Sequence, residues 1–237
     1  MTENSADPKD LNLLRTAAQG GDPVAQFKLG LVLDGGLGTD ADPVEAAEWY
    51  GRAAEQGQAN AQLNLGVLYY EGRGVARDTA LAAEWYRRAA VQGLAEAQSN
   101  LGILYSNGEG VRRDPFEAVR LYRAAAERGV DTAQYLLAKA YEDGVGVSTD
   151  LSEAARYYTM AAERGHGGAE HALALLYRQG RGVKRDWRAA WRWARIATRN
   201  PVVRRYTERR MVRDAAWAVA ILALAWLLVR SVILRSR

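Results

Sequence analysis

An uninterrupted repeat of 36 residues constrains this 237-residue chain more than any other feature of its sequence. The dipeptide Ala-Gln, or Ala-Glu in the last copy, recurs at this step, and so do a Gly-x-Gly pair and an aspartate. The dipeptides begin at Ala25, Ala61, Ala97, Ala133 and Ala169, the glycine pairs at Gly36, Gly72, Gly108, Gly144 and Gly180, and the aspartates are Asp42, Asp78, Asp114, Asp150 and Asp186. Five copies without an insertion predict a solenoid of stacked, equivalent units.

Each copy has the pattern of two helices. In the second copy, apolar residues at helical spacing predict a first helix over 60–71 that ends at Gly72. A second helix is expected to begin after Asp78, whose side chain can cap its first turn, and to end at Gly93. In three copies a glutamate three residues after the aspartate predicts a reciprocal capping box. These glutamates are Glu45, Glu117 and Glu153. Residues 1–21 hold a half-copy that we expect to cap the stack.

The copy from Ala61 to Gly93 has the pattern Ala-Gln-x2-Leu-Gly-x2-Tyr-x2-Gly-x-Gly-Val-x2-Asp-x3-Ala-x2-Trp-Tyr-x2-Ala-Ala-x-Gln-Gly. This pattern resembles the Sel1-like repeat, a relative of the tetratricopeptide repeat, and the resemblance covers about residues 22–199. It implies an all-α, right-handed solenoid of antiparallel helix pairs whose first helices line a concave surface. It also implies an adaptor or scaffold for protein complexes, often at a membrane. The end copies depart from the pattern at Leu33, Ala194 and Pro201, which suits terminal repeats.

Partner-binding residues are expected where the copies differ on the first helices. Positions that recur in every copy serve packing, whereas the variable positions form a mixture of apolar and hydrogen-bonding groups suited to an extended peptide or a helix. These candidates are Phe27, Lys28, Leu31, Leu63, Asn64, Val67, Tyr70, Asn100, Ile103, Tyr135 and Lys139. Lys28, Asn64 and Asn100 form one row that can clamp a bound backbone and its carboxylate. The alternative for this row is a set of solvated polar residues.

Several classes of site have no support in the sequence. The chain has no cysteine, which excludes disulfides and thiolate metal sites. Its only histidines, His166 and His171, are five positions apart and point to different sides of a helix. No nucleophile elbow, phosphate loop or dinucleotide fingerprint stands out. We therefore predict no catalytic residues, no metal, no cofactor and no small-molecule substrate.

The charge is divided along the chain. Residues 1–177 carry a net charge of −9 and residues 178–213 one of +11. Part of this positive charge lies on the last repeat, from Arg178 to Arg195, so that this end is expected to face a membrane or an acidic subunit. The rest lies on a predicted basic linker, 200–213, whose membrane-proximal cations are Arg204, Arg205, Arg209, Arg210 and Arg213. Nucleic-acid binding is disfavoured because the body of the solenoid is acidic.

An apolar segment follows the linker. Residues 215–229 contain no charge, and a helix over 214–235 is long enough to span a bilayer when Arg230 extends its charge to the headgroups. A soluble helix capping the last repeat is the alternative, but it would show a polar face. The basic linker is attracted to anionic lipid headgroups and favours retention on the cytoplasmic side. The sequence thus predicts a single-pass, tail-anchored protein with cytoplasmic repeats.

The hypothesis from the sequence is a membrane-anchored, non-enzymatic adaptor that binds a protein partner on the concave surface. It would serve as an accessory subunit or assembly factor of a membrane complex. The alternative is an envelope-side structural protein whose repeats lie outside the cytoplasm.

Overall fold

The computed structural model describes residues 8–37 and 39–199, with side chains from residue 11 onward. These residues form eleven α-helices, most of them 13 residues long. The helices are α1 (Pro8–Gln19), α2 (Pro23–Gly35), α3 (Pro43–Glu55), α4 (Ala59–Glu71), α5 (Thr79–Val91), α6 (Ala95–Asn107), α7 (Pro115–Glu127), α8 (Asp131–Asp143), α9 (Leu151–Glu163), α10 (Gly167–Gln179) and α11 (Trp187–Ala197).

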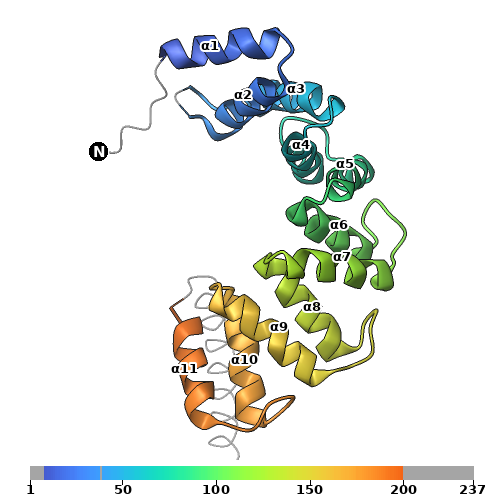
Figure 1. Cartoon of the computed structure of the whole chain (residues 1–237), viewed down its shortest axis with the longest axis vertical. Coiled ribbons are helices and arrows are strands. Elements are labelled where there is room, and N and C mark those ends of the chain that lie inside the picture. The colour runs from blue at the N-terminus through green and yellow to red at the C-terminus, as the bar shows by residue number, and fades with distance from the viewer. Residues whose placement is uncertain (1–7, 38, 200–237) are drawn as a thin grey trace, which may run out of the picture. The chain divides into compact units, whose positions relative to one another are not determined.

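The helices belong to two compact units, one ending at Tyr157 and the other beginning at Tyr158, so that the division falls within α9. In the first unit α2 packs on α3, α4 on α5 and α6 on α7 (Figure 1). Successive pairs are joined by packing of α3 on α4, α5 on α6 and α7 on α8, and α1 packs on α2. In the second unit α10 packs on α11. The expected all-α repeat solenoid is confirmed, whereas its handedness, its concave side and the limits of the predicted segments stay predictions.

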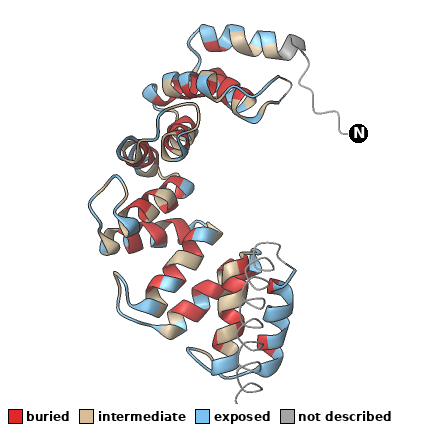
Figure 2. Cartoon of the chain, turned by 180° about the vertical axis from the view of Figure 1, so that it is seen from behind, coloured by how far each residue is buried: buried red, intermediate tan, exposed pale blue. Residues whose placement is uncertain are grey.

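The core lies between the paired helices, where the buried residues gather (Figure 2). Its members include tyrosines of the second helices, such as Tyr50 and Tyr86, which are 0% and 3% exposed. Each ring lies against a glycine in the first helix of its own copy. A Cβ added to Gly30 or Gly66 would stand 2.6 or 2.7 Å from ring carbons. Glycine at this position therefore makes room for the tyrosine.

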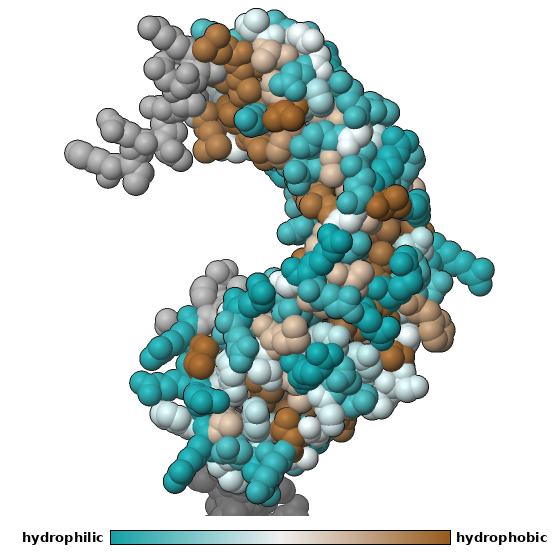
Figure 3. All heavy atoms as spheres, in the orientation of Figure 1, coloured by the Kyte–Doolittle hydropathy of each residue, from teal (hydrophilic) through white to brown (hydrophobic). Residues whose placement is uncertain are grey.

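Hydrophobic residues gather on the visible surface over α1 and α2, at one end of the first unit (Figure 3). The exposed apolar side chains of these two helices include Leu13, Val24 and Leu31. The first copy of a repeat array lacks a full neighbour on one side, which accounts for this exposure.

The Gly-x-Gly pair forms the loop between the two helices of a copy. Gly72 ends α4 in the left-handed conformation, with a φ of +71°, and its N–H donates to the carbonyl of Leu68. Gly74 also has a positive φ, and a Cβ there would collide with the carbonyl of Pro43 at the start of α3. The second glycine of the pair therefore lets the loop pack on the backbone of the preceding copy.

Aspartates cap the second helices as predicted, but the reciprocal capping box is wrong. The carboxylate of Asp42 accepts hydrogen bonds from the N–H groups of Val44 and Glu45. The N–H of Asp42, which the box assigns to the Glu45 side chain, donates instead to the carbonyl of Leu33 at 2.9 Å. Glu45 binds Arg15 and Trp49. The long loop returns to the end of the first helix, so a backbone acceptor replaces the glutamate.

The recurring glutamine joins one copy to the next. Gln62, at the start of α4, is buried, and its Nε2 donates to the carbonyl of Ala54 near the end of α3 at 3.0 Å. Its Oε1 accepts from Nε2 of Gln92 at 2.8 Å. The equivalent donations in the other copies of the first unit are Gln26 to Ala18, Gln98 to Ala90 and Gln134 to Ala126. The carbonyl of Ala54 also accepts from the N–H of Gly57 at 3.0 Å, so the glutamine adds a second donor at the end of α3 and connects that helix to the next copy.

Within residues 8–37 and 39–199, none of the helices combines the length and apolar character needed to cross a bilayer. The predicted basic linker 200–213 and the predicted transmembrane helix 214–235 lie outside the described residues. The membrane-proximal arginines, Arg204 to Arg213, lie outside them as well.

Candidate functional site

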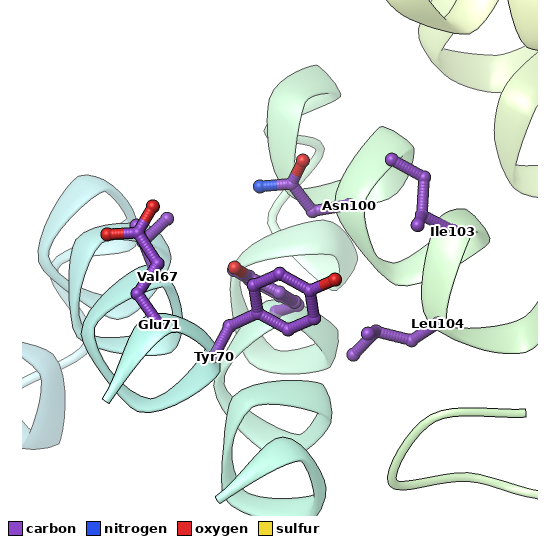
Figure 4. Close-up of a pocket in the computed structure, with 7 residues that line it drawn as sticks. Val67, Tyr70, Glu71, Asn100, Ile103 and Leu104 are labelled. Atoms are coloured by element: carbon purple, nitrogen blue, oxygen red, sulfur yellow. The ribbon is translucent and has the colours of Figure 1, made fainter. Parts of the chain in front are cut away.

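A pocket of about 220 Å³ opens between α4 and α6, with one lining residue from α5. It is lined by Val67, Tyr70, Glu71, Tyr86, Asn100, Ile103 and Leu104. The labelled side chains from α4 and α6 surround it (Figure 4). Residues three apart lie one above the other on a helix, so α4 presents Val67 and Tyr70 together while α6 presents Asn100 and Ile103. The structure thus brings together four of the predicted partner-binding residues.

Tyr86 forms the buried wall of this pocket. Burial raises the pKa of its phenol, the carboxylate of Glu71 and the neighbouring Tyr70 raise it further, and the side chain of Asn100 lowers it. The net effect is an increase from an already high value, so the phenol is neutral at physiological pH. The pocket therefore has an uncharged polar group next to its apolar lining.

The rim at Tyr70 is held in place by two charged residues. Nε of Arg77 donates to the carbonyl of Tyr70 at 2.9 Å, and its guanidinium lies 5.7 Å from the centre of the Tyr70 ring. Burial and the nearby Glu109 carboxylate raise the pKa of the Tyr70 phenol. Arg77 and Glu109 approach each other to 3.9 Å. These contacts hold the Tyr70 ring at the edge of the pocket even when no partner protein is bound.

The opposite charges beside the pocket are paired. Nε of Arg73 lies 3.1 Å from Oε2 of Glu71, and the same guanidinium forms an ion pair with Asp34 of α2. These side chains are partly solvent-exposed, so the ion pairs contribute little to stability. Their effect is to leave the pocket without a strong net charge, which suits an apolar group of a partner.

The row of Lys28, Asn64 and Asn100 does not present three equivalent side chains. Lys28 is exposed, whereas the two asparagines are half-buried. Asn64 lies by Tyr50 of the preceding copy and lowers its pKa, although burial raises that pKa to about 12. The buried Tyr50 hydroxyl has no hydrogen-bond partner among the described residues. Each asparagine thus lies beside a tyrosine of the preceding copy, and the peptide clamp stays a prediction.

The remaining predicted residues are spread over α2, α4 and α8. Phe27 packs against Tyr50, with ring centroids 6.0 Å apart, and Leu63 packs against the core. Leu31 is 39% exposed. On α8, Tyr135 is half-buried, and Nζ of Lys139 lies 3.0 Å from a carboxylate oxygen of Asp143. These residues do not line the α4–α6 pocket.

The histidines are part of the second unit. His166 precedes α10, and its Nδ1 accepts a hydrogen bond from the N–H of Ala169 at 3.2 Å. Across the part of the chain that the structure describes, no group of three or more acidic residues, histidines or cysteines is arranged to hold a metal ion.

The comparisons with known proteins agree with this architecture. The family model described as the Sel1 repeat matches five consecutive segments of the chain, which are residues 23–58, 59–94, 95–130, 131–166 and 168–201. The chain belongs to the Sel1 repeat family. No curated protein is significantly similar to it in sequence.

Among solved structures, this Sel1 repeat chain is similar to a protective antigen of uropathogenic Escherichia coli, at 39% identity and a TM-score of 0.76. The match covers 79% of this chain but only 40% of the antigen. It is also similar to a Sel1 repeat protein of Oxalobacter formigenes, at 34% identity and a TM-score of 0.72, over 82% of this chain and 85% of that one. An immunity protein of Pseudomonas aeruginosa shares the fold at 18% identity and a TM-score of 0.52, over 81% of this chain and 73% of its own.

The pocket of this Sel1 repeat chain includes three residues that the sequence did not single out as partner-binding. Tyr86 and Leu104 belong to recurring positions that serve packing, and Glu71 is the last residue of α4. Glu71 lies one helical turn beyond Val67, which was predicted to bind a partner, so helical spacing from Val67 could have identified Glu71 as well. No sequence signal marked Tyr86 as a pocket residue. A tyrosine recurs at this position to pack the helices, and it reaches a pocket only where the neighbouring helices leave a gap.

Proposed function

We propose that this Sel1 repeat chain is a non-enzymatic scaffold that binds a segment of a protein partner across α4 and α6. The observation that carries the proposal is the α4–α6 pocket, which combines apolar side chains with a neutral phenol and an amide. Pockets of this composition bind an apolar anchor while a few polar groups fix its orientation. Membership of the Sel1 repeat family supports the same role, since this family typically supplies scaffolds for protein complexes.

The bound segment is proposed to run across successive first helices. Asn100 lines the α4–α6 pocket and also a second hollow that includes Glu96 and Ser99 of α6 and Asp131 of α8. A segment that places an apolar side chain in the pocket therefore passes over Asn100 on its way to α8. The Asn100 amide has two donor hydrogens and an acceptor, enough to contact both Tyr86 and a passing backbone.

The test compares two arginine substitutions in the full-length chain, purified from its own cells in mild detergent. Ile103→Arg fills the pocket with a charge, while Val91→Arg changes an 84% exposed residue of α5 outside it. We expect partner chains to co-purify with the Val91→Arg variant and to be lost from Ile103→Arg, with thermal melts showing both variants folded. Co-purification of the same chains with both variants would refute the pocket as the anchor.

We further propose that segment 214–235 anchors the chain in a membrane and that the chain serves a membrane complex as an accessory subunit or assembly factor. The support is the uncharged run 215–229 preceded by the arginines of the linker 200–213. The full-length chain should float with vesicles and resist extraction by alkaline carbonate. Complete release by carbonate would contradict a spanning helix.

The repeats are proposed to face the cytoplasm, because basic residues next to a membrane segment favour retention on that side. In spheroplasts, the repeats should resist added protease until the membrane is permeabilised. Cleavage in intact spheroplasts would support the alternative, a structural protein on the envelope side.

A further inference from the structure

The last helix that the structure describes, α11, exposes two of its three tryptophans. Trp187 and Trp191, one turn apart on α11, are 58% and 65% exposed. The same helix buries small residues, Ala189, Ala190 and Ala197. A helix that buries alanines and exposes tryptophans leaves its largest apolar side chains available to another molecule.

The equivalent position in earlier copies behaves in the opposite way. Trp191 corresponds to Ala47, Ala83 and Val119 in the first unit, which are 6%, 1% and 5% exposed. The last copy of a repeat array ordinarily carries a polar outer face. On α11 an exposed tryptophan stands at this position, so a large aromatic surface is open to solvent among the described residues.

The exposed tryptophans lie among cations. The guanidinium of Arg185 lies 4.7 Å from the centre of the Trp187 ring, and that of Arg195 lies 5.3 Å from the Trp191 ring. Between 178 and 199 the acidic residue is Asp186, which is engaged in capping α11 through the N–H groups of Arg188 and Ala189. The basic residues of this stretch are Arg178, Arg181, Lys184, Arg185, Arg188, Arg192, Arg195 and Arg199.

We propose that the α11 face, made by Trp187, Trp191, Arg188, Arg192 and Arg195, binds the surface of an anionic lipid bilayer. Tryptophan is amphipathic and favours the headgroup level, while arginines beside it attract anionic headgroups. A hollow at the start of α11 adds further cations. The inference rests on the proposed membrane attachment, which brings a bilayer close to this unit.

The first alternative is that the chain's own linker, 200–213, covers the α11 face, and its charge argues against this. Segment 200–213 has five arginines and one glutamate, so it would bring positive charge against a positive face. The uncharged run 215–229 that follows could cover the tryptophans, but it offers no negative charge to the arginines beside them.

The experiment uses the full-length chain with one introduced cysteine, which labels cleanly because the sequence has none. Ala194→Cys places an environment-sensitive fluorophore on an exposed position of α11 close to Trp191, and Val91→Cys places it on α5 as the control. Each protein is reconstituted into phosphatidylcholine vesicles with or without phosphatidylglycerol, and quenching by a lipid-borne quencher is measured.

We expect strong quenching at position 194, and little at position 91, in vesicles that contain phosphatidylglycerol. High salt and the combined change of Arg188, Arg192 and Arg195 to Gln should reduce it, since each removed charge weakens lipid contact by about fivefold. Replacing Trp187 and Trp191 by Ser should also reduce it.

Three results would overturn the proposal. Equal quenching in both kinds of vesicle would remove the anionic requirement, and shielding of the label from aqueous quenchers before vesicles are added would show that the chain covers its own face. A response to duplex DNA or RNA without one to anionic vesicles would assign the face to nucleic acid. Flotation with pure phosphatidylcholine vesicles reports on segment 214–235 separately, so failure of the anchor and failure of the α11 face are distinguishable.

Discussion

Gly66 of α4 lies directly against the ring of Tyr86 of α5, with no space for a side chain between them: an added Cβ would stand 2.7 Å from two ring carbons. The same relationship joins Gly102 to Tyr122 in the next copy. Close approach of the paired helices therefore depends on this glycine, and the tyrosine that fills the gap also walls the pocket.

Gly66→Ala should lower the free energy of unfolding by about 1–3 kcal/mol, because the methyl group must push the ring or the helix aside. Gly51→Ala is the matched control, since a Cβ at Gly51 in α3 meets no atom within 4 Å. That change should stabilise the chain by about 0.5–1 kcal/mol, as alanine does inside a helix. Urea unfolding followed by circular dichroism measures both. Equal changes in the free energy of unfolding for the two variants would show that the contact with the Tyr86 ring does not determine which residues fit at position 66.

Glu170→Gln should stabilise the second unit. Glu170 stands where earlier copies have the buried glutamine, is 4% exposed and leaves Oε2 without a hydrogen bond among the described residues. Burial raises the pKa of this carboxyl above its ordinary value. An amide would be uncharged and could donate to the carbonyl of Ala162, eight residues earlier, as Gln134 does to Ala126.

The pH dependence tests the same residue. Because the pKa of Glu170 is higher in the folded chain, the folded state binds more protons between the unfolded and folded pKa values. The free energy of unfolding should thus fall as pH rises through that window, and the Glu170→Gln variant should lose this part of the slope. Gln134→Glu should introduce a similar slope into the first unit. Parallel pH profiles for wild type and Glu170→Gln would contradict the assignment.

Asn100→Ala should lower the free energy of unfolding by about 1 kcal/mol through loss of its interaction with Tyr86. In a Tyr86→Phe background, which lacks the hydroxyl, the same substitution should have little further effect. A double-mutant cycle measured by thermal unfolding gives the coupling between the two side chains. Zero coupling, together with lost partner binding, would favour the peptide clamp over the structural role.

Asp78→Ala should cost about 1 kcal/mol of stability, the usual effect of losing an N-cap side chain. The Asp78 carboxylate accepts from the N–H groups of Ala80 and Leu81 at 2.9 and 3.0 Å, and alanine offers no acceptor. Asp78→Asn keeps an acceptor and should remain close to wild type. Chemical unfolding of both variants gives the comparison, and equal losses would point to charge rather than capping.

The helices were predictable because their signals are local and recur in each copy. The first helix expected over 60–71 forms over Ala59–Glu71, and the second begins directly after Asp78. Gly72 and Asp78 act on their own turns, so spacing alone locates them. Contacts between copies were harder to foresee. Arg73 reaches Asp34 from 39 residues away, and this pair does not recur, because the equivalent residues one copy later are Glu109 and Tyr70. The contact of Asn100 with Tyr86 does recur, as Asn64 with Tyr50, but it joins two copies and the pattern of a single helix does not show it.

The contact of Gly74 with the backbone at Pro43 explains why the copies never change length. The same contact joins Gly110 to Thr79 and Gly146 to Pro115, always between a loop and the copy before it. A residue inserted ahead of such a glycine would move a Cβ into that peptide group. The length of each loop is therefore fixed by its contact with the main chain of the preceding copy, even where the side chains of the copies differ.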